Sequence, residues 1–189
     1  PMQYNTALGF AVCGAGVLSI VNERRSLALS FGAFGFLLGF LTLVEYVFAV
    51  DLQIDQLAME HYITVETSHP GRMAPNTALC FTLTGLGITT LALPRARAGT
   101  ALLLGILILV LGLIALGGYV IGIETAYGFG NLTRMAVHTV FGFALLGPAL
   151  FVIASVSSHW IMGSVGTKAV LALTVLVGLF LCGRHSAIC

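Results

Sequence analysis

The feature that most constrains this chain is a series of long apolar runs separated by short clusters of charged residues. A helix needs about 20 apolar residues to cross the roughly 30 Å hydrocarbon core of a bilayer. Only 8% of the side chains are charged, whereas soluble domains carry about 25%. The sequence therefore predicts an all-α membrane protein with six transmembrane helices, at approximately 5–21, 27–50, 75–93, 100–123, 136–156 and 168–183.

Composition also excludes several classes of function. A net charge of +1 gives no basic surface for nucleic acid. The four cysteines contain no CxxC pair, so neither a zinc site nor a redox motif is indicated. No catalytic constellation is found either, and we expect no nucleic-acid partner, no metal site and no enzymatic activity.

The positively charged residues are divided unevenly between the two sets of loops. One set holds Arg24, Arg25, Arg95, Arg97 and Lys168, and the other holds Arg72, Arg134 and Arg184. Because Lys and Arg are enriched in cytoplasmic loops, we expect the loops of the first set to lie on the cytoplasmic side. We expect a multi-pass protein of a bacterial inner membrane with both ends of this segment on the periplasmic side. Since the sequence begins with Pro1, we also expect it to start after processing or inside a longer reading frame.

The chain contains a threefold internal similarity. The nonapeptides 2–10, 73–81 and 135–143 align without a gap and place Asn5, Asn76 and His138 at one position. Nine residues later come Gly14, Gly85 and Gly147. A fixed repeat of this kind predicts repeated structural units. The prediction is three parallel two-helix repeats, at about 2–55, 73–128 and 135–189, related about an axis along the membrane normal.

The repeat brings polar residues to one membrane surface. The even-numbered helices end there with Tyr46, Tyr119 and His185, each seven residues after a glycine (Gly39, Gly112 and Gly178). Two interpretations of Asn5 and Asn76 stay open: they cap their helices, or, with His138, they line an outward-facing pocket. We expect Gly14, Gly85 and Gly147 each to contact a neighbouring helix, since small residues allow membrane helices to approach closely.

Glu45 is the single carboxylate inside a predicted span, and an ionisable group within a membrane span is a candidate functional residue. It could sense a ligand or proton, or have a structural role. His138 and His185 could ligate haem or a metal ion, but no attachment motif is present and the sequence identifies no cofactor. The candidate ligand-binding residues are Glu45, Tyr46, Asn5, Asn76, Tyr119, His138 and His185.

Three segments, 41–57, 69–81 and 132–139, resemble the multi-helix membrane module at the N-terminus of many bacterial sensor histidine kinases and diguanylate cyclases. The resemblance implies that signalling domains follow the module and that its ligand is generally undefined. No catalytic residue can be transferred, because the catalytic chemistry of that family lies in those domains. Since no output domain follows here, we expect either a fragment or a stand-alone member that acts through a partner.

Two main hypotheses of function remain. The first is a sensory module that detects a periplasmic or membrane-soluble stimulus and transmits it by helix repacking. The second is an accessory or scaffold subunit of a photosynthetic or respiratory complex, in contact with pigment, quinone or haem. The partners implied are the lipid bilayer, other membrane protein subunits or a cytoplasmic signalling domain, and a second copy in a homodimer. A transporter is a third hypothesis. Transporter substrate sites are expected where Gly or Pro breaks a helix in the middle of the membrane, and Pro148 is the sole proline in the middle of a predicted span.

Overall fold

The structure is a computed structural model that describes residues 3–54, 71–93, 98–123, 125, 127–128 and 133–158. These residues form five helices and no strand, so the all-α prediction is confirmed for this part of the chain. The predicted span 168–183 lies outside the described residues, and so does His185. The helices are α1 (Tyr4–Val21), α2 (Arg25–Phe48), α3 (Pro75–Ala92), α4 (Ala98–Ile121) and α5 (Val137–Ser158).

Four of these helices, α1, α2, α4 and α5, are long and apolar enough to cross a membrane. The exception is α3, whose 18 residues include five threonines. Eleven of its residues are buried, and four of its threonine hydroxyls donate hydrogen bonds to carbonyl oxygens one turn back in the helix. Because α3 lies among other helices, it can carry hydroxyl groups that a lipid-facing helix would expose to hydrocarbon.

Local sequence explains where the helices begin and end. A short turn after α1 contains Glu23 with a positive φ of 59°, and it reverses the chain into α2. After α2 the backbone turns at Ala49, which adopts the left-handed conformation. Pro75 occupies the start of α3, as predicted, where its missing N–H leaves no hydrogen bond unmade.

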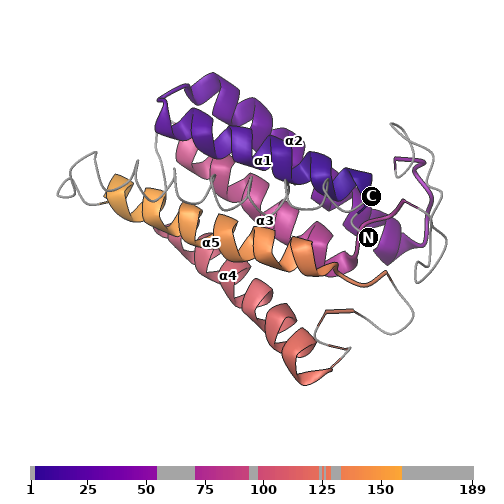
Figure 1. Cartoon of the computed structure of the whole chain (residues 1–189). Helices are drawn as coiled ribbons and strands as arrows, with labels where there is room; N and C mark the ends of the chain where they lie inside the picture. The colour runs from indigo at the N-terminus through magenta and orange to yellow at the C-terminus, as the bar shows by residue number, and fades with distance from the viewer. Residues whose placement is uncertain are drawn as a thin grey trace, which may run out of the picture.

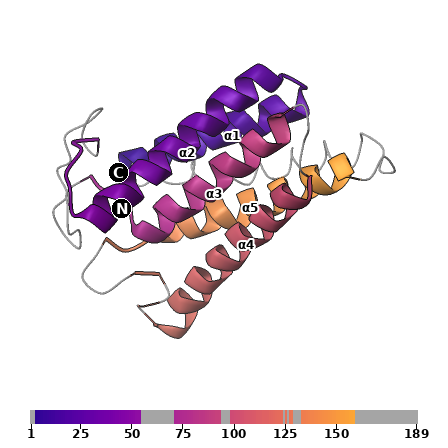
Figure 2. The same cartoon turned by 180° about the vertical axis from the view of Figure 1, so that it is seen from behind.

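Three helices form an inner triangle, and the other two pack outside it. α1, α3 and α5 contact one another; α2 packs against α1 and α3, and α4 packs against α3 and α5. Figures 1 and 2 show α2 and α4 on opposite sides of this inner group. The starts of α1, α3 and α5 lie at the same end of the bundle as the ends of α2 and α4 (Figure 1). We call this the Tyr46 end.

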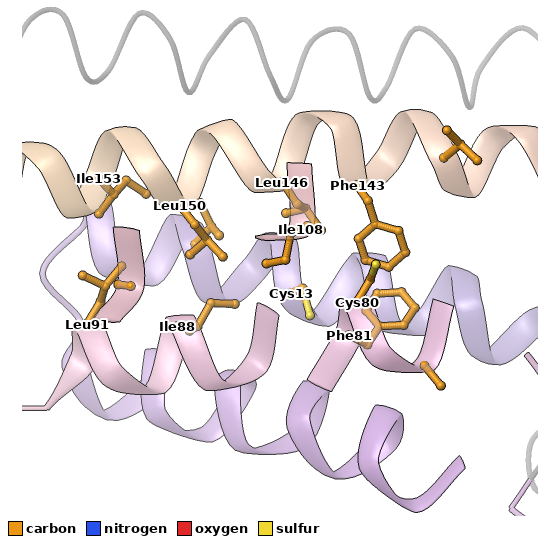
Figure 3. Packing of buried hydrophobic residues seen from close by; sticks show 14 of the residues in the cluster. Cys13, Cys80, Phe81, Ile88, Leu91, Ile108, Phe143, Leu146, Leu150 and Ile153 are labelled. Atoms are coloured by element: carbon orange, nitrogen blue, oxygen red, sulfur yellow. The ribbon is translucent and has the colours of Figure 1, made fainter. Parts of the chain in front are cut away.

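Three phenylalanines form the centre of the triangle. Phe10, Phe81 and Phe143 occupy the same position of the three aligned nonapeptides. Their ring centroids are 5.0 Å apart for Phe10 and Phe81, 4.8 Å for Phe10 and Phe143, and 4.9 Å for Phe81 and Phe143. Figure 3 shows Phe81 and Phe143 next to each other, with Ile88 and Leu150 further along the helices. α1, α3 and α5 thus meet through residues that the alignment treats as equivalent.

Two of the three predicted glycine contacts are confirmed. A methyl group at Gly85 would overlap the α2 backbone at Phe36 and Gly32, and one at Gly147 would overlap the α4 backbone at Leu109 and Gly105. These glycines therefore allow the α2/α3 and α4/α5 backbones to approach closely. For Gly14 the structure contains no contact: no described atom lies within 4 Å of such a methyl group.

Candidate functional site

Glu45 lies near the end of α2 and is completely buried. It is the sole carboxylate in the five described helices. Removing a charge from water is costly unless an opposite charge and hydrogen bonds compensate for it. Both kinds of partner are present, because the side chain accepts a 2.9 Å hydrogen bond from the Leu52 N–H and forms an ion pair with Arg72.

Arg72 comes from the segment just before α3, where Gly71 adopts a φ of 83°. Its side chain is only 3% exposed, and its Nε lies 3.4 Å from Glu45 Oε2. The guanidinium carbon lies 5.5 Å from the centre of the Tyr46 ring, within the range of a cation–π interaction. A second carboxylate, that of Asp51, approaches Arg72 to 3.7 Å and is largely exposed. The buried Glu45–Arg72 pair is therefore extended towards the surface by Asp51.

The same region connects four segments of the chain. The segment after α2 folds back so that Leu52 contacts Glu45, and Asn5 of α1 donates a 3.1 Å hydrogen bond to the Ile54 carbonyl. Tyr46 donates a 2.9 Å hydrogen bond to the Met73 carbonyl before α3. We call these residues the Glu45 cluster: Asn5, Glu45, Tyr46, Asp51, Leu52, Ile54, Arg72 and Met73. It links the start of α1, the end of α2, the following loop and the entry to α3.

The α4/α5 pair has a related arrangement around Tyr119. Tyr119 donates a hydrogen bond to the Met135 carbonyl. Its ring stacks on Tyr127, with centroids 3.9 Å apart and planes 9° apart. The alignment makes Tyr119 equivalent to Tyr46, and Met135 equivalent to Met73. A tyrosine hydroxyl thus joins an even-numbered helix to the entry of the next helix in both pairs.

The capping interpretation of Asn5 and Asn76 is wrong. Gln3 and Ala74 stand at the N-cap positions of α1 and α3, and neither helix has a side-chain cap hydrogen bond. Asn5 lies inside the first turn, where its side chain bonds the Ile54 carbonyl instead. Asn76 is half-buried, and His138 is exposed.

Of the candidate residues, the structure brings Asn5, Glu45 and Tyr46 into one cluster. Tyr119 lies at the same end of the bundle but in the α4/α5 arrangement. No group of three or more His, Cys, Asp or Glu residues that could hold a metal ion occurs among the described residues. His138 and His185 as a pair of haem ligands stay a prediction, because His185 lies outside that part of the chain.

Sequence reasoning missed Arg72 as a site residue. Its signal was its position directly before the Met73 nonapeptide, which Arg134 repeats before Met135. The threonine that follows each aligned Asn or His is buried in all three helices, one helical turn before the phenylalanines: these are Thr6, Thr77 and Thr139. Comparison of the chain with protein-family models, curated proteins and solved structures gives no match.

Proposed function

We propose that this chain is a sensory module of a bacterial inner membrane, which detects a stimulus at its Tyr46 end and transmits it by helix repacking. The observation that carries the proposal is the buried ion pair between Glu45 of α2 and Arg72 before α3. In this proposal the Tyr46 end faces the periplasm and the chain has no enzymatic activity. The proposal includes the expected relation of segments 41–57, 69–81 and 132–139 to the membrane module of sensor kinases and cyclases.

A buried ion pair is suited to switching because its paired and unpaired states differ strongly in free energy. A stimulus that changes the pairing therefore acts strongly on the structure around it. Breaking such a pair by removing one partner costs about 3–5 kcal/mol, because an uncompensated charge stays buried. A ligand or proton that changes the pairing of Glu45 would act on the ends of α2, α1 and α3 together, through Leu52, Asn5 and Tyr46. The stimulus must prefer one helix arrangement over the other to shift their populations.

We further propose that the fold consists of six spans in three parallel two-helix repeats. Support comes from the phenylalanine triangle and from the corresponding contacts of Gly85 and Gly147. Under this proposal α1, α3 and α5 are the inner helices of the three copies, and α2 and α4 are outer helices. A sensor built in this way can change output by small shifts of outer helices against the inner triangle.

The test is a fusion of the chain to a reporter kinase after Cys189. One version attaches the kinase directly and another through an added transmembrane helix, so that the kinase reaches the cytoplasm in either orientation. We expect output to respond to a periplasmic or membrane-soluble stimulus, and Glu45→Gln to remove the response. Leu113→Ala, on an exposed face of α4, is the matched control. Constant output under every stimulus, with Glu45→Gln and His138→Ala behaving like the parent, would contradict sensing.

A second candidate is an accessory subunit of a larger membrane complex. It is favoured by the aromatic surface of α2, where Phe34 and Phe40 are exposed and Phe40 stacks on Phe36 with centroids 5.5 Å apart. Such a surface could contact pigment, quinone, haem or another subunit. Purification in mild detergent separates the candidates: stoichiometric partners with bound pigment favour the subunit, whereas a homodimer or a longer signalling chain favours the sensor.

A further inference from the structure

The third side of the inner triangle, between α5 and α1, carries no helix among the described residues, whereas α2 and α4 cover the other two sides. α1 presents Ala7, Ala11, Gly14 and Leu18 along one face, because these residues recur at helical spacing. Ala7, Ala11 and Leu18 are exposed and Gly14 is half-buried. The residues of this face are small apart from the last.

The composition of this face differs from that of the faces expected to meet lipid. The outward face of α4 consists of large aliphatic residues, among them Leu103, Ile106, Val110 and Leu113. In membrane proteins, small residues are enriched where helices contact each other, because they allow two backbones to approach closely. The α1 face therefore has the composition of a helix contact.

The positions of this face also match two helix contacts that the structure contains. The gapless alignment of the first two nonapeptides, continued along the helices, makes the α1 face equivalent to Ala78, Thr82, Gly85 and Thr89. These are the α3 residues that lie against Gly39, Phe36 and Gly32 of α2. In the third copy, the residues equivalent to the last three are Ala144, Gly147 and Phe151 of α5. They lie against Gly112, Leu109 and Gly105 of α4.

We infer that the face of α1 formed by Ala7, Ala11, Gly14 and Leu18 binds the apolar segment 168–183 of the same chain. Helix α5 ends at Ser158, and segment 168–183 lies in the stretch of sequence between that residue and Cys189. Segment 168–183 contains Gly178, which the alignment makes equivalent to Gly39 and Gly112. Gly39 lies against Thr82, and Gly112 lies against Ala144. Thr82 and Ala144 are the residues that the alignment makes equivalent to Ala11. The inferred register therefore places Gly178 beside Ala11.

This inference rests on the repeat proposed above and not on sensing. It is tested by cross-linking in a chain whose four native cysteines are replaced by alanine. Ala11→Cys combined with Gly178→Cys should form a disulfide within one chain. The positive control combines Gly16→Cys with Phe31→Cys, since a methyl group at Gly16 would lie 3.2 Å from the Phe31 Cβ. The negative control combines Gly117→Cys on α4 with Gly178→Cys.

We expect the Ala11/Gly178 pair to cross-link as fully as the positive control and the Gly117/Gly178 pair not to cross-link. Absence of the Ala11/Gly178 disulfide while the positive control forms would overturn the inference. A disulfide between two chains carrying Ala11→Cys alone would also overturn it, in favour of a second copy on this face. None of these readouts depends on a stimulus, so failure of sensing and failure of this contact are distinguishable.

Leucine substitutions test the same contact without new cysteines. At Gly14 and at Gly117 no described atom lies within 4 Å of an added methyl group. If segment 168–183 covers Gly14, then Gly14→Leu lowers the yield of folded protein as Gly85→Leu does, and Gly117→Leu leaves the yield unchanged. Equal, unchanged yields for Gly14→Leu and Gly117→Leu would refute the contact.

Discussion

The α2/α3 and α4/α5 pairs share a glycine contact in their middles and a tyrosine hydrogen bond at the Tyr46 end, but their tyrosine rings have different neighbours. In α2/α3 the ring of Tyr46 lies beside the guanidinium of Arg72, which pairs with Glu45. In α4/α5 the ring of Tyr119 stacks on Tyr127. The first tyrosine thus meets a buried charge and the second an uncharged ring.

This difference arises at one position of the repeat. The alignment that makes Tyr46 and Tyr119 equivalent places Gly118 where the first pair has Glu45. The glycine and tyrosine contacts are therefore common to both pairs and explain how each pair is held together. A carboxylate occupies this repeat position in the first pair alone, so the buried Glu45 is what distinguishes that pair from the second.

Removing the carboxylate should have the largest effect. Glu45→Ala removes the buried carboxylate that pairs with the buried Arg72 guanidinium, so the free energy of unfolding should fall by about 3–5 kcal/mol. Thermal or denaturant unfolding in detergent measures the loss. The double variant Glu45→Met/Arg72→Met should recover most of it, because no charge remains buried. A loss below about 1 kcal/mol for Glu45→Ala lies in the range of solvent-exposed ion pairs. Such a result would remove the distinction between the α2/α3 and α4/α5 helix pairs.

The glycine contacts should be affected next, and equally in both pairs. Gly85→Leu and Gly147→Leu insert a side chain where the backbone of α2 or α4 lies. Overpacking of this kind costs about 1–3 kcal/mol in unfolding free energy. The control is Leu113→Ala, on the exposed side of α4. Strong destabilisation in one pair alone would show that the two contacts are not equivalent.

Leu109 shows that an apolar run does not reveal which of its leucines face lipid. By sequence it is one of many leucines in an apolar run, and we would expect it to face lipid. The structure places its backbone against Gly147 and leaves its side chain half-buried. Apolar content alone does not separate lipid-facing from helix-facing leucines, because lipid and protein interior are similarly apolar.

The tyrosine hydrogen bonds should give smaller, matched effects. Tyr46→Phe and Tyr119→Phe each remove the hydroxyl that donates to the carbonyl of Met73 or Met135. The expected loss is about 0.5–1.5 kcal/mol of unfolding free energy for each. Phenylalanine keeps the ring beside Arg72 or Tyr127, so the two variants compare the hydrogen bonds alone. A loss several times larger for one of them would mean that the neighbour of the ring controls the bond.

The sequence predicted the described helices well because each is a long apolar run between clusters of charged or helix-breaking residues. Predicted and observed ends differ by at most two residues for α1 to α5, as at 100–123 against Ala98–Ile121. The start of α3 at Pro75 was predicted from its residue type. Of the seven candidate ligand-binding residues, the structure brings Asn5, Glu45 and Tyr46 into one cluster.

The partners of those residues could not be predicted in the same way. Arg72 is distant from Glu45 along the chain and lies in a loop, and no local periodicity connects them. Their contact depends on how closely α2 and α3 approach, which Gly39 and Gly85 determine. The capping interpretation of Asn5 was wrong because residue type alone does not reveal that the loop after α2 returns to α1, where the Ile54 carbonyl accepts a hydrogen bond from the Asn5 side chain.

The smallest effect is expected at the exposed edge of the charged cluster. Asp51 lies 3.7 Å from Arg72 with its side chain 69% exposed, and it also accepts a hydrogen bond from the Gln53 N–H. Water and salt screen an exposed charge, so such pairs contribute about 0–1 kcal/mol. Asp51→Asn should therefore reduce the free energy of unfolding only slightly, and the difference from the parent should shrink further in high salt.

Measuring Asp51→Asn and Glu45→Gln in low and high salt shows where the charge of this cluster acts. Glu45 is buried, so its contribution should depend little on ionic strength, because buried pairs are screened much less than exposed ones. The loss in Glu45→Gln should accordingly persist in high salt. If salt removed the Glu45 contribution as it removes that of Asp51, solvent would reach the ion pair, and the α2/α3 end would not differ from α4/α5 by a buried charge.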